Sequence, residues 1–230
     1  MFSFFKKHSK PLFEGLCDIH NHILPGIDDG CKNINMSLEM LTAYEKLGFK
    51  SLIPTPHIFQ ELYPNTPTTI KNSFLELTKN NKIENHPNIP AYAAEYMVDE
   101  IFLKNIEIEN PKLLLPNNYI LVEINFFGST NLLEKACFKI SQKNINPILA
   151  HPERYTYIQT IQDFKKLKQK GFYFQLNALS LNGHYGPHVK QKAQNLLMEG
   201  LYDFIATDAH NKTHLEQLNY IKLSRKEVLK

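Results

Sequence analysis

Cysteine is scarce in this chain of 230 residues, which contains only Cys17, Cys31 and Cys137. Their odd number and the lack of any C-x-x-C spacing argue against a disulfide framework. Reduced thiols of this kind are typical of the cytoplasm, and we expect a cytoplasmic protein. No arginine stands six residues after any of the three cysteines, so the C-x5-R loop of cysteine-dependent tyrosine phosphatases is absent from the sequence.

Arginine and net charge are also low. Lysine plus arginine number 26 against 23 acidic residues, and Arg154 and Arg225 are the only arginines. A formal charge of +3 spread along the chain argues against nucleic acid as the main partner. No apolar run approaches the ~18–20 residues that span a bilayer, so we expect no transmembrane segment. Residues 1–15 begin with a short apolar and basic stretch, which we interpret as an N-terminal tail.

Two glycine-rich phosphate motifs are missing as well. The chain has neither G-x-x-x-x-G-K-[ST] nor G-x-G-x-x-G, which argues against nucleotide-driven chemistry and dinucleotide binding. What remains is an ordinary globular composition, with 43% hydrophobic and 21% charged residues. A chain of this length buries roughly 70% of its unfolded surface. With no internal repeat or linker, residues 1–230 are expected to form a single domain.

Short apolar segments alternate with amphipathic ones along most of the chain. The apolar segments predict buried strands, at residues 16–23, 50–55, 91–97, 119–126, 146–150, 172–177 and 202–207. The amphipathic segments predict helices, at residues 37–47, 131–143, 163–170, 187–199 and 214–229. Gly48 and Gly171 stand where helix C-cap glycines belong. Strand–helix alternation with short connections implies parallel strands, in an open sheet or a barrel.

Residues that coordinate metals recur at the carboxyl ends of these strands, where active sites of parallel α/β folds assemble. Residues two apart in a strand point to the same side, so His20 and His22 converge, as do Asp208 and His210. Nine side chains form the candidate metal-ligand set: His20, His22, Asp29, His57, Glu95, Glu123, His151, Asp208 and His210.

Nine ligands exceed what one ion uses, so the set predicts two or three divalent ions. The four carboxylates carry a charge of −4, which two divalent ions would neutralise. Three ions would leave +2, which suits a dianionic phosphate. Imidazole and carboxylate ligands without thiolate favour manganese, iron or zinc.

The strings D-x-H-x-H, D-D-G, T-P-H, A-E, V-E, A-H-P-E-R-Y and T-D-A-H, in this order, resemble the PHP (polymerase and histidinol phosphatase) superfamily. LPGIDDG and AHPERY make the chain most similar to the bacterial manganese-dependent protein-tyrosine phosphatases encoded with capsule and exopolysaccharide genes. The resemblance runs from Cys17 to Asn211. It implies a distorted (β/α)7 barrel, the PHP fold, with a trinuclear metal site at the carboxyl ends of the strands.

The resemblance also implies roles for single residues. All nine candidates match ligand positions of the family, with Asp29 rather than Asp28 matching the loop aspartate. Arg154 is expected to be catalytic and to bind the substrate phosphate. Family members often carry a second phosphate-binding arginine after the last D-x-H. This chain has Lys212 there as the nearest cation, and we take Lys212 as a second candidate for binding the substrate phosphate.

The expected reaction is metal-dependent hydrolysis of phosphotyrosine on a protein, with manganese the favoured ion. The resemblance implies that the partner is the tyrosine-rich tail of a bacterial tyrosine kinase that controls capsular or exopolysaccharide synthesis. Three alternatives stay open at this point. They are a PHP phosphoesterase that acts on a small metabolite such as histidinol phosphate, an amidohydrolase-like barrel, and a non-catalytic protein with a structural metal.

Overall fold

The computed structural model describes residues 12–230 apart from 81–85, 127, 224 and 229–230. Most of the expected N-terminal tail, residues 1–11, therefore lies outside the described residues. Its last part is packed against the domain. Phe13 is buried and stacks on Phe49 with ring centroids 5.1 Å apart. The Gly15 amide donates to the carbonyl oxygen of Gly48 at 2.7 Å, so residues 12–15 belong to the folded domain.

All strand pairs of the structure are parallel, as the strand–helix alternation predicts. The strands are β1 (Cys17–Asp18), β2 (Ser51–Leu52), β3 (His57–Ile58), β4 (Glu95–Val98), β5 (Tyr119–Ile124), β6 (Asn146–Ala150), β7 (Tyr173–Asn177) and β8 (Phe204–Ala206). Strands β3 to β8 form one sheet in sequence order, and β1 pairs with β2. The protein thus has an α/β fold with a parallel sheet.

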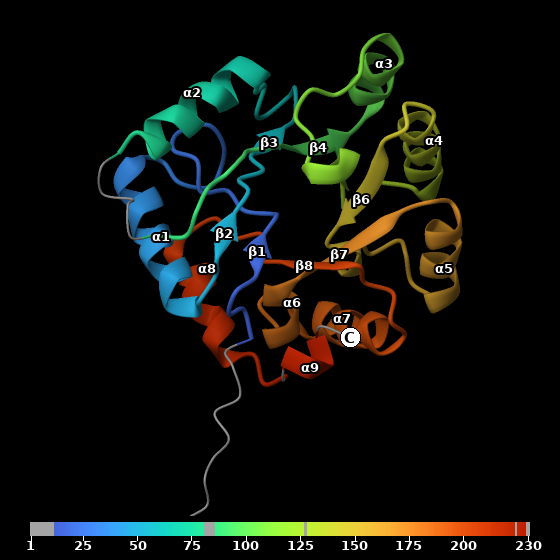
Figure 1. The fold of residues 1–230 in the computed structure, drawn as a ribbon. Helices are drawn as coiled ribbons and strands as arrows, with labels where there is room; N and C mark the ends of the chain where they lie inside the picture. The colour runs from blue at the N-terminus through green and yellow to red at the C-terminus, as the bar shows by residue number, and fades with distance from the viewer. Residues whose placement is uncertain (1–11, 81–85, 127, 224, 229–230) are drawn as a thin grey trace, which may run out of the picture.

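Backbone hydrogen bonds beyond the strands connect the two sheets. The Asp208 amide donates to the carbonyl oxygen of His20 at 2.8 Å, and the His22 amide to that of Ala209 at 3.0 Å. At the other junction, the Ala93 amide just before β4 donates to the carbonyl oxygen of Pro54 just after β2 at 2.9 Å. The strands consequently lie around a common centre, with the helices outside them (Figure 1). The bonds at His20 and His22 also explain why the predicted strand 16–23 is short, because its second half turns to meet residues 208–209.

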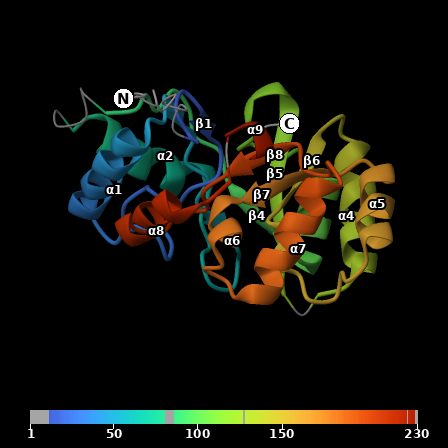
Figure 2. The same cartoon turned by 90° about the horizontal axis from the view of Figure 1, so that it is seen from below.

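The helices are α1 (Ile34–Leu47), α2 (Pro67–Thr78), α3 (Glu100–Ile108), α4 (Thr130–Ser141), α5 (Ile161–Gln169), α6 (Ala178–Asn182), α7 (Pro187–Met198), α8 (Lys212–Gln217) and α9 (Arg225–Val228). Four helices, α1, α4, α5 and α7, begin and end within a few residues of the predicted positions. In Figure 2, α4, α5 and α7 cover one side of the strands, whereas α1, α2 and α8 gather on the other. No helix of the described residues has the length and apolar character needed to cross a membrane.

The prediction of one helix over residues 214–229 was wrong. Helix α8 ends at Gln217, a 3-10 turn follows over Leu218–Tyr220, and α9 begins only at Arg225. Ile221 has extended backbone angles. Together with Leu223 it packs on the cluster of Leu176, Leu181 and Ala193. Ile221 and Leu223 are two residues apart, and residues at this spacing point to the same side in an extended chain but not in a helix. Packing of both side chains on this cluster therefore explains why the helix is interrupted between α8 and α9.

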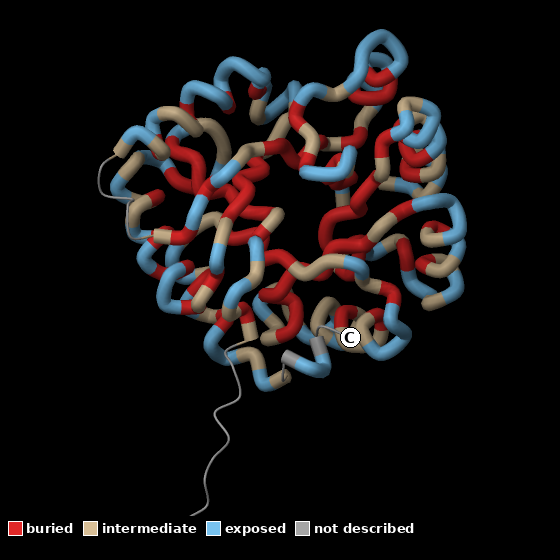
Figure 3. Tube along the Cα trace, in the orientation of Figure 1, coloured by how far each residue is buried: buried red, intermediate tan, exposed pale blue. Residues whose placement is uncertain are grey.

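Besides the cluster around Leu176, two apolar clusters pack on opposite faces of the strands. The larger one joins the strands to the helices and includes Ile120, Val122 and Ile124 of β5. The smaller one contains Leu121 of β5 and no residue of the nine helices, so it lies on the opposite face of the strands. In Figure 3, the buried residues accordingly lie along the central strands. Side chains alternate along a strand, so Glu123 lies on the same face of β5 as Leu121. On this face, polar residues replace apolar ones toward the carboxyl ends of the strands.

Candidate metal centre

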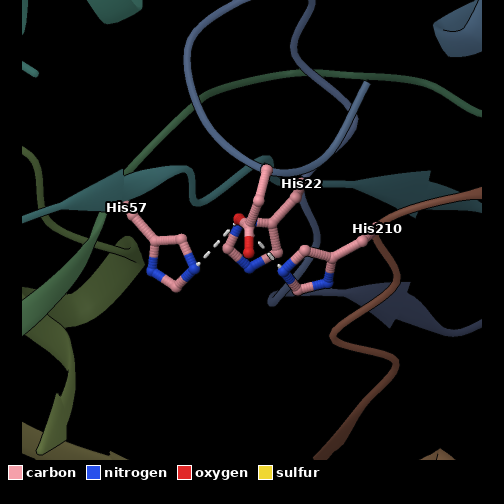
Figure 4. Close-up of side chains that lie close together, drawn as sticks. His22, His57 and His210 are labelled. Atoms are coloured by element: carbon pink, nitrogen blue, oxygen red, sulfur yellow. Dashed lines mark ion pairs between the residues drawn. The ribbon is translucent and has the colours of Figure 1, made fainter. Parts of the chain in front are cut away.

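The structure brings all nine predicted side chains together at the carboxyl ends of the strands. Eight of them form three overlapping groups, in each of which the possible ligand atoms lie within 4.8 Å of one another. The groups are His22, Asp29, His57 and His210; His20, His22, Glu95 and Asp208; and His57, Glu95 and Glu123. His151 joins them, because its Nε2 lies 3.2 Å from Oε1 of Glu95. Figure 4 shows His57 and His210 on either side of His22.

Hydrogen bonds to one ring nitrogen orient three of the histidines. Nδ1 of His20 lies 2.8 Å from Oε1 of Gln175, and Nδ1 of His22 lies 2.8 Å from Oδ2 of Asp28. Nδ1 of His210 lies 2.9 Å from the carbonyl oxygen of Asp208. Each ring therefore turns Nε2 toward the centre, which is how partners outside a metal site usually fix its histidines.

Several positioning residues were not assigned a role by sequence reasoning. Gln175 was visible as a polar residue in an apolar strand, and it is buried beside His20. Asp18 was visible in the D-x-H-x-H string. Its carboxylate accepts hydrogen bonds from the Tyr44 hydroxyl at 2.7 Å and from the Thr207 hydroxyl at 2.6 Å. Asp18 thus ties the start of the His20–His22 segment to the residue that precedes Asp208.

The backbone is strained at two of the clustered residues. His151 has φ 35° and Asp208 has φ 50°, a left-handed region that side chains other than glycine seldom occupy. His151 directly follows β6, and Asp208 follows the end of β8 by two residues. Such strain persists where the surrounding structure enforces it, and it is concentrated at functional sites.

The donor atoms fit a cation. Oε2 of Glu95 is fully buried, and it lies 3.1 Å from both Nε2 of His20 and Nδ1 of His57 without the alignment of a hydrogen bond. Nε2 of His20 and Nε2 of His22 face each other at 3.4 Å. Lone pairs from two imidazoles and a carboxylate that converge in this way are satisfied by a shared positive ion.

The charges of the cluster keep its buried carboxylates ionised. Burial alone would raise the pKa of Asp208, but the neighbouring His20, His22 and His210 together outweigh it and hold that pKa well below its usual range. Burial likewise opposes ionisation of Glu95, whose pKa His20 and His57 lower far below normal. Ionised carboxylates at the centre are the form that binds metals.

Arg154 points into the same centre from the 3-10 turn η3 (Pro152–Arg154) after β6. Its Nη1 donates a hydrogen bond to Oδ2 of Asp208 at 2.9 Å. Burial opposes the positive charge, yet the attraction of Asp208 raises the pKa of Arg154. Its neighbour Glu153 turns away and accepts hydrogen bonds from the Asn177 amide and the Ser180 hydroxyl.

Lys212 lies differently from Arg154. It is the first residue of α8, its side chain is half exposed, and its Nζ lies 3.7 Å from Oε1 of Glu216 on the same helix. It lines a shallow hollow between α1 and α8 with Glu39 and Lys46. The expected role of Lys212 in phosphate binding therefore stays a prediction.

Comparison with known proteins identifies relatives over most of the chain. A family model described as "Capsular polysaccharide synthesis, CpsB/CapC" matches residues 16–219. Tyrosine-protein phosphatase YwqE of Bacillus subtilis (strain 168) is 30% identical over 211 residues, which cover 90% of this chain and 83% of that protein. Tyrosine-protein phosphatase CpsB of Streptococcus pneumoniae is 25% identical over 202 residues, covering 85% and 83%.

Solved structures agree with this relationship. A crystal structure from a study of YwqE and CpsB, described as metal-dependent tyrosine phosphatases, superposes with a TM-score of 0.78 at 29% identity. The match covers 90% of this chain and 85% of that one. Histidinol phosphate phosphatase of Lactococcus lactis subsp. lactis has a TM-score of 0.54 at 14% identity, covering 90% and 92%. The second likeness concerns the fold alone.

Proposed function

Because the chain belongs to the CpsB/CapC family of capsular polysaccharide synthesis, we propose that it is a metal-dependent phosphatase that hydrolyses phosphotyrosine on proteins. The observation that carries this proposal is the convergence of nine imidazole and carboxylate side chains beside a partly buried arginine. Phosphate monoesters such as phosphotyrosine are dianionic near neutral pH, and their hydrolysis needs positive charge around the phosphorus atom. The site can supply it through bound cations and Arg154.

We assign the nine clustered residues as ligands of two or three divalent ions. The three groups share His22, His57 and Glu95, which supports ions that lie close together rather than in separate sites. Oxygen and nitrogen donors without thiolate favour manganese, with iron and zinc as alternatives. When bound, such ions supply Lewis-acid chemistry that activates water and neutralises charge on the phosphate.

The protein's own contribution to the reaction is orientation and charge. Arg154 donates hydrogen bonds to phosphate oxygens, a geometry for which a planar guanidinium is suited. Asp208 holds the guanidinium through Nη1, and Gln175 and Asp28 hold the rings of His20 and His22. Tyrosinate leaves readily because the phenol has a pKa of about 10, so a strong general acid is less necessary.

The cysteines do not suit a nucleophilic mechanism. Burial raises the pKa of the Cys31 thiol to about 11. Burial also raises the pKa values of Cys17 and Cys137, and all three are free thiols. A reactive thiolate needs the opposite shift.

The proposal also covers the type of barrel, the number of domains, the protein substrate and the cellular location. We infer a distorted seven-stranded PHP barrel, in which the short strands β2 and β3, separated by only four residues, count as one strand. The hydrogen bonds between residues 20–22 and 208–209 support closure of the barrel, and we also infer a single domain over residues 1–230. The proposed substrate is the tyrosine-rich tail of a bacterial tyrosine kinase, and the proposed location is the cytoplasm. Free cysteines and the family relationship support these two inferences.

A comparison of substrates tests the proposal. Purified protein loaded with Mn²⁺ is expected to release phosphate from a phosphotyrosine peptide, to act poorly on histidinol phosphate and to lose activity after exhaustive chelation. Manganese added back should restore activity better than zinc. Higher kcat/KM on histidinol phosphate would favour the metabolite phosphoesterase, and full activity of metal-free protein would refute metal dependence.

A further inference from the structure

The guanidinium of Arg154 lies between two aromatic rings. Its Cζ is 4.7 Å from the ring centroid of Phe126, which follows β5, and 4.2 Å from that of Tyr185, in the turn between α6 and α7. Both distances are within the range of cation–π contact. Nothing in the spacing of the sequence indicated that Phe126 or Tyr185 belongs to the site.

A small hydrogen-bond network fixes the position of Tyr185. The buried amide Nδ2 of Asn177 donates to the Tyr185 hydroxyl at 3.0 Å and to Oδ2 of Asp208 at 2.8 Å. The same Oδ2 accepts from Nη1 of Arg154. Asn177 is itself held as the N-cap of α6, where its Oδ1 accepts from the Leu179 amide at 2.9 Å. Ring stacking and hydrogen bonds therefore link Arg154, Asp208, Asn177 and Tyr185 in one closed loop.

This hydrogen-bond network uses only one nitrogen, Nη1, of the Arg154 guanidinium. Nε and Nη2 of Arg154 make no hydrogen bond to any of the described residues, although four fifths of the side chain is buried. Two parallel donors on one edge of a guanidinium match two oxygens of a phosphate. An arginine side chain without lateral support would move among several rotamers and present that edge only part of the time.

We propose that Tyr185 is a positioning residue, which with Phe126 fixes the plane of Arg154 and leaves its Nε–Nη2 edge for the phosphate group of the substrate. The inference rests on the proposed phosphatase function. The planar ring performs this task, whereas the Tyr185 hydroxyl secures the ring through Asn177. Tyr185 thereby acts on the reaction through Arg154.

The test combines substitutions at Tyr185 with removal of Arg154. Tyr185→Phe keeps the planar ring and is expected to retain kcat/KM on a phosphotyrosine peptide within about threefold. Tyr185→Leu keeps apolar volume but loses the planar face, and we expect a loss of about tenfold or more, because small misplacements of a binding group cost up to ~100-fold. In an Arg154→Ala background, Tyr185→Leu should cause no further loss. Metal content should stay unchanged in all variants.

A matched control is available on β7. Tyr173 also packs beside a cation, Lys168, but at the amino end of the strand, so Tyr173→Leu should leave kcat/KM unaltered. Isothermal titration of metal-loaded protein with inorganic phosphate gives a readout apart from turnover, and Tyr185→Leu and Arg154→Ala should weaken binding to a similar extent. Wild-type activity of Tyr185→Leu, or an equal loss with and without Arg154, would overturn the inference. Wild-type protein that is inactive on phosphotyrosine would refute the proposed function, while the phosphate titration would still decide the role of Tyr185.

Discussion

Two adjacent aspartates of the D-D-G string have different surroundings. The Asp29 side chain is half exposed, and its Oδ1 lies 3.4 Å from Nε2 of both His57 and His210. The Asp28 side chain is buried and accepts from three donors, the His22 ring and the backbone amides of Gly30 and His57. Burial opposes its ionisation, but His22 and His57 lower the pKa of Asp28. Asp29 thus faces the centre, whereas Asp28 supports it.

Asp28→Asn should weaken metal binding about 10- to 100-fold, the usual effect of losing the partner of a metal-bound histidine. An amide nitrogen would face either the His22 ring or the Gly30 amide, and two donors cannot bond to each other. Titration of chelator-treated protein with Mn²⁺ measures the change. Asp163→Asn, on the exposed first turn of α5, is the control and should bind metal normally. Wild-type affinity in Asp28→Asn would show that His22 needs no such partner.

At the scale of elements, α1 ends where the sequence predicts. Gly48 has φ 81°, and its amide donates to the carbonyl oxygen of Glu45. A Cβ atom added to Gly48 would come within 3.2 Å of the backbone Cα of Glu14. The glycine therefore serves both the left-handed turn and the close approach of residues 12–15.

Gly48→Ala should lower the free energy of unfolding by more than the ~1–2 kcal/mol that a left-handed conformation costs an ordinary residue. Gly200 after α7 provides the control, because it has φ 65° and a Cβ there would meet no atom within 4 Å. Urea unfolding of both alanine variants gives the comparison. Equal losses for Gly48→Ala and Gly200→Ala would mean that the contact with Glu14 is relieved at no cost.

Local patterns predicted the helices with clear periodicity and caps, including α1, α4 and α7, to within a few residues at each end. Helices α2 and α3 were missed, although Thr66 and Asp99 cap them through hydrogen bonds to Thr69 and Phe102. A single cap without a long amphipathic run is a weak signal. Some strands were predicted too long, most of all at residues 16–23 and 50–55, whereas β6 has the predicted bounds. Near His20 and Asp208 the backbone pairs across the junction of the two sheets, which local sequence does not encode.

For the site, a period of two and the strand-end rule indicated most of the nine clustered residues. Asp29 lies in a loop, and its choice over Asp28 rested on the family resemblance. The same reasoning could not find Gln175, Asn177 or Tyr185. Their partners, His20, Asp208 and Arg154, lie far away in the sequence. None of the three residues belongs to a motif whose spacing indicates a metal site or a phosphate site. Such contacts depend on tertiary structure, which no pattern in a single sequence specifies.

At the scale of the whole molecule, the candidate metal centre lies where the two sheets meet. β1 and β8 share no continuous ladder, only a parallel bridge between Asn21 and Ala209 with the neighbouring backbone hydrogen bonds. His20 and His22 flank one side of this bridge, and Asp208 and His210 flank the other. Ions shared by the two segments would therefore reinforce the least continuous part of the ring.

Removal of metal should consequently lower thermal stability and loosen this junction first. A ligand that binds only the folded state at a hundred times its Kd stabilises it by about 2.7 kcal/mol. For a domain of this size each kcal/mol shifts Tm by ~2–4 °C, so chelation should lower Tm by about 5–10 °C. Scanning calorimetry with and without Mn²⁺ measures the shift. Hydrogen exchange should quicken at residues 18–22 and 206–210 more than in the paired centre of β5 and β6. An unchanged Tm, or a uniform rise in exchange across both regions, would contradict a role for the ions in closing the ring.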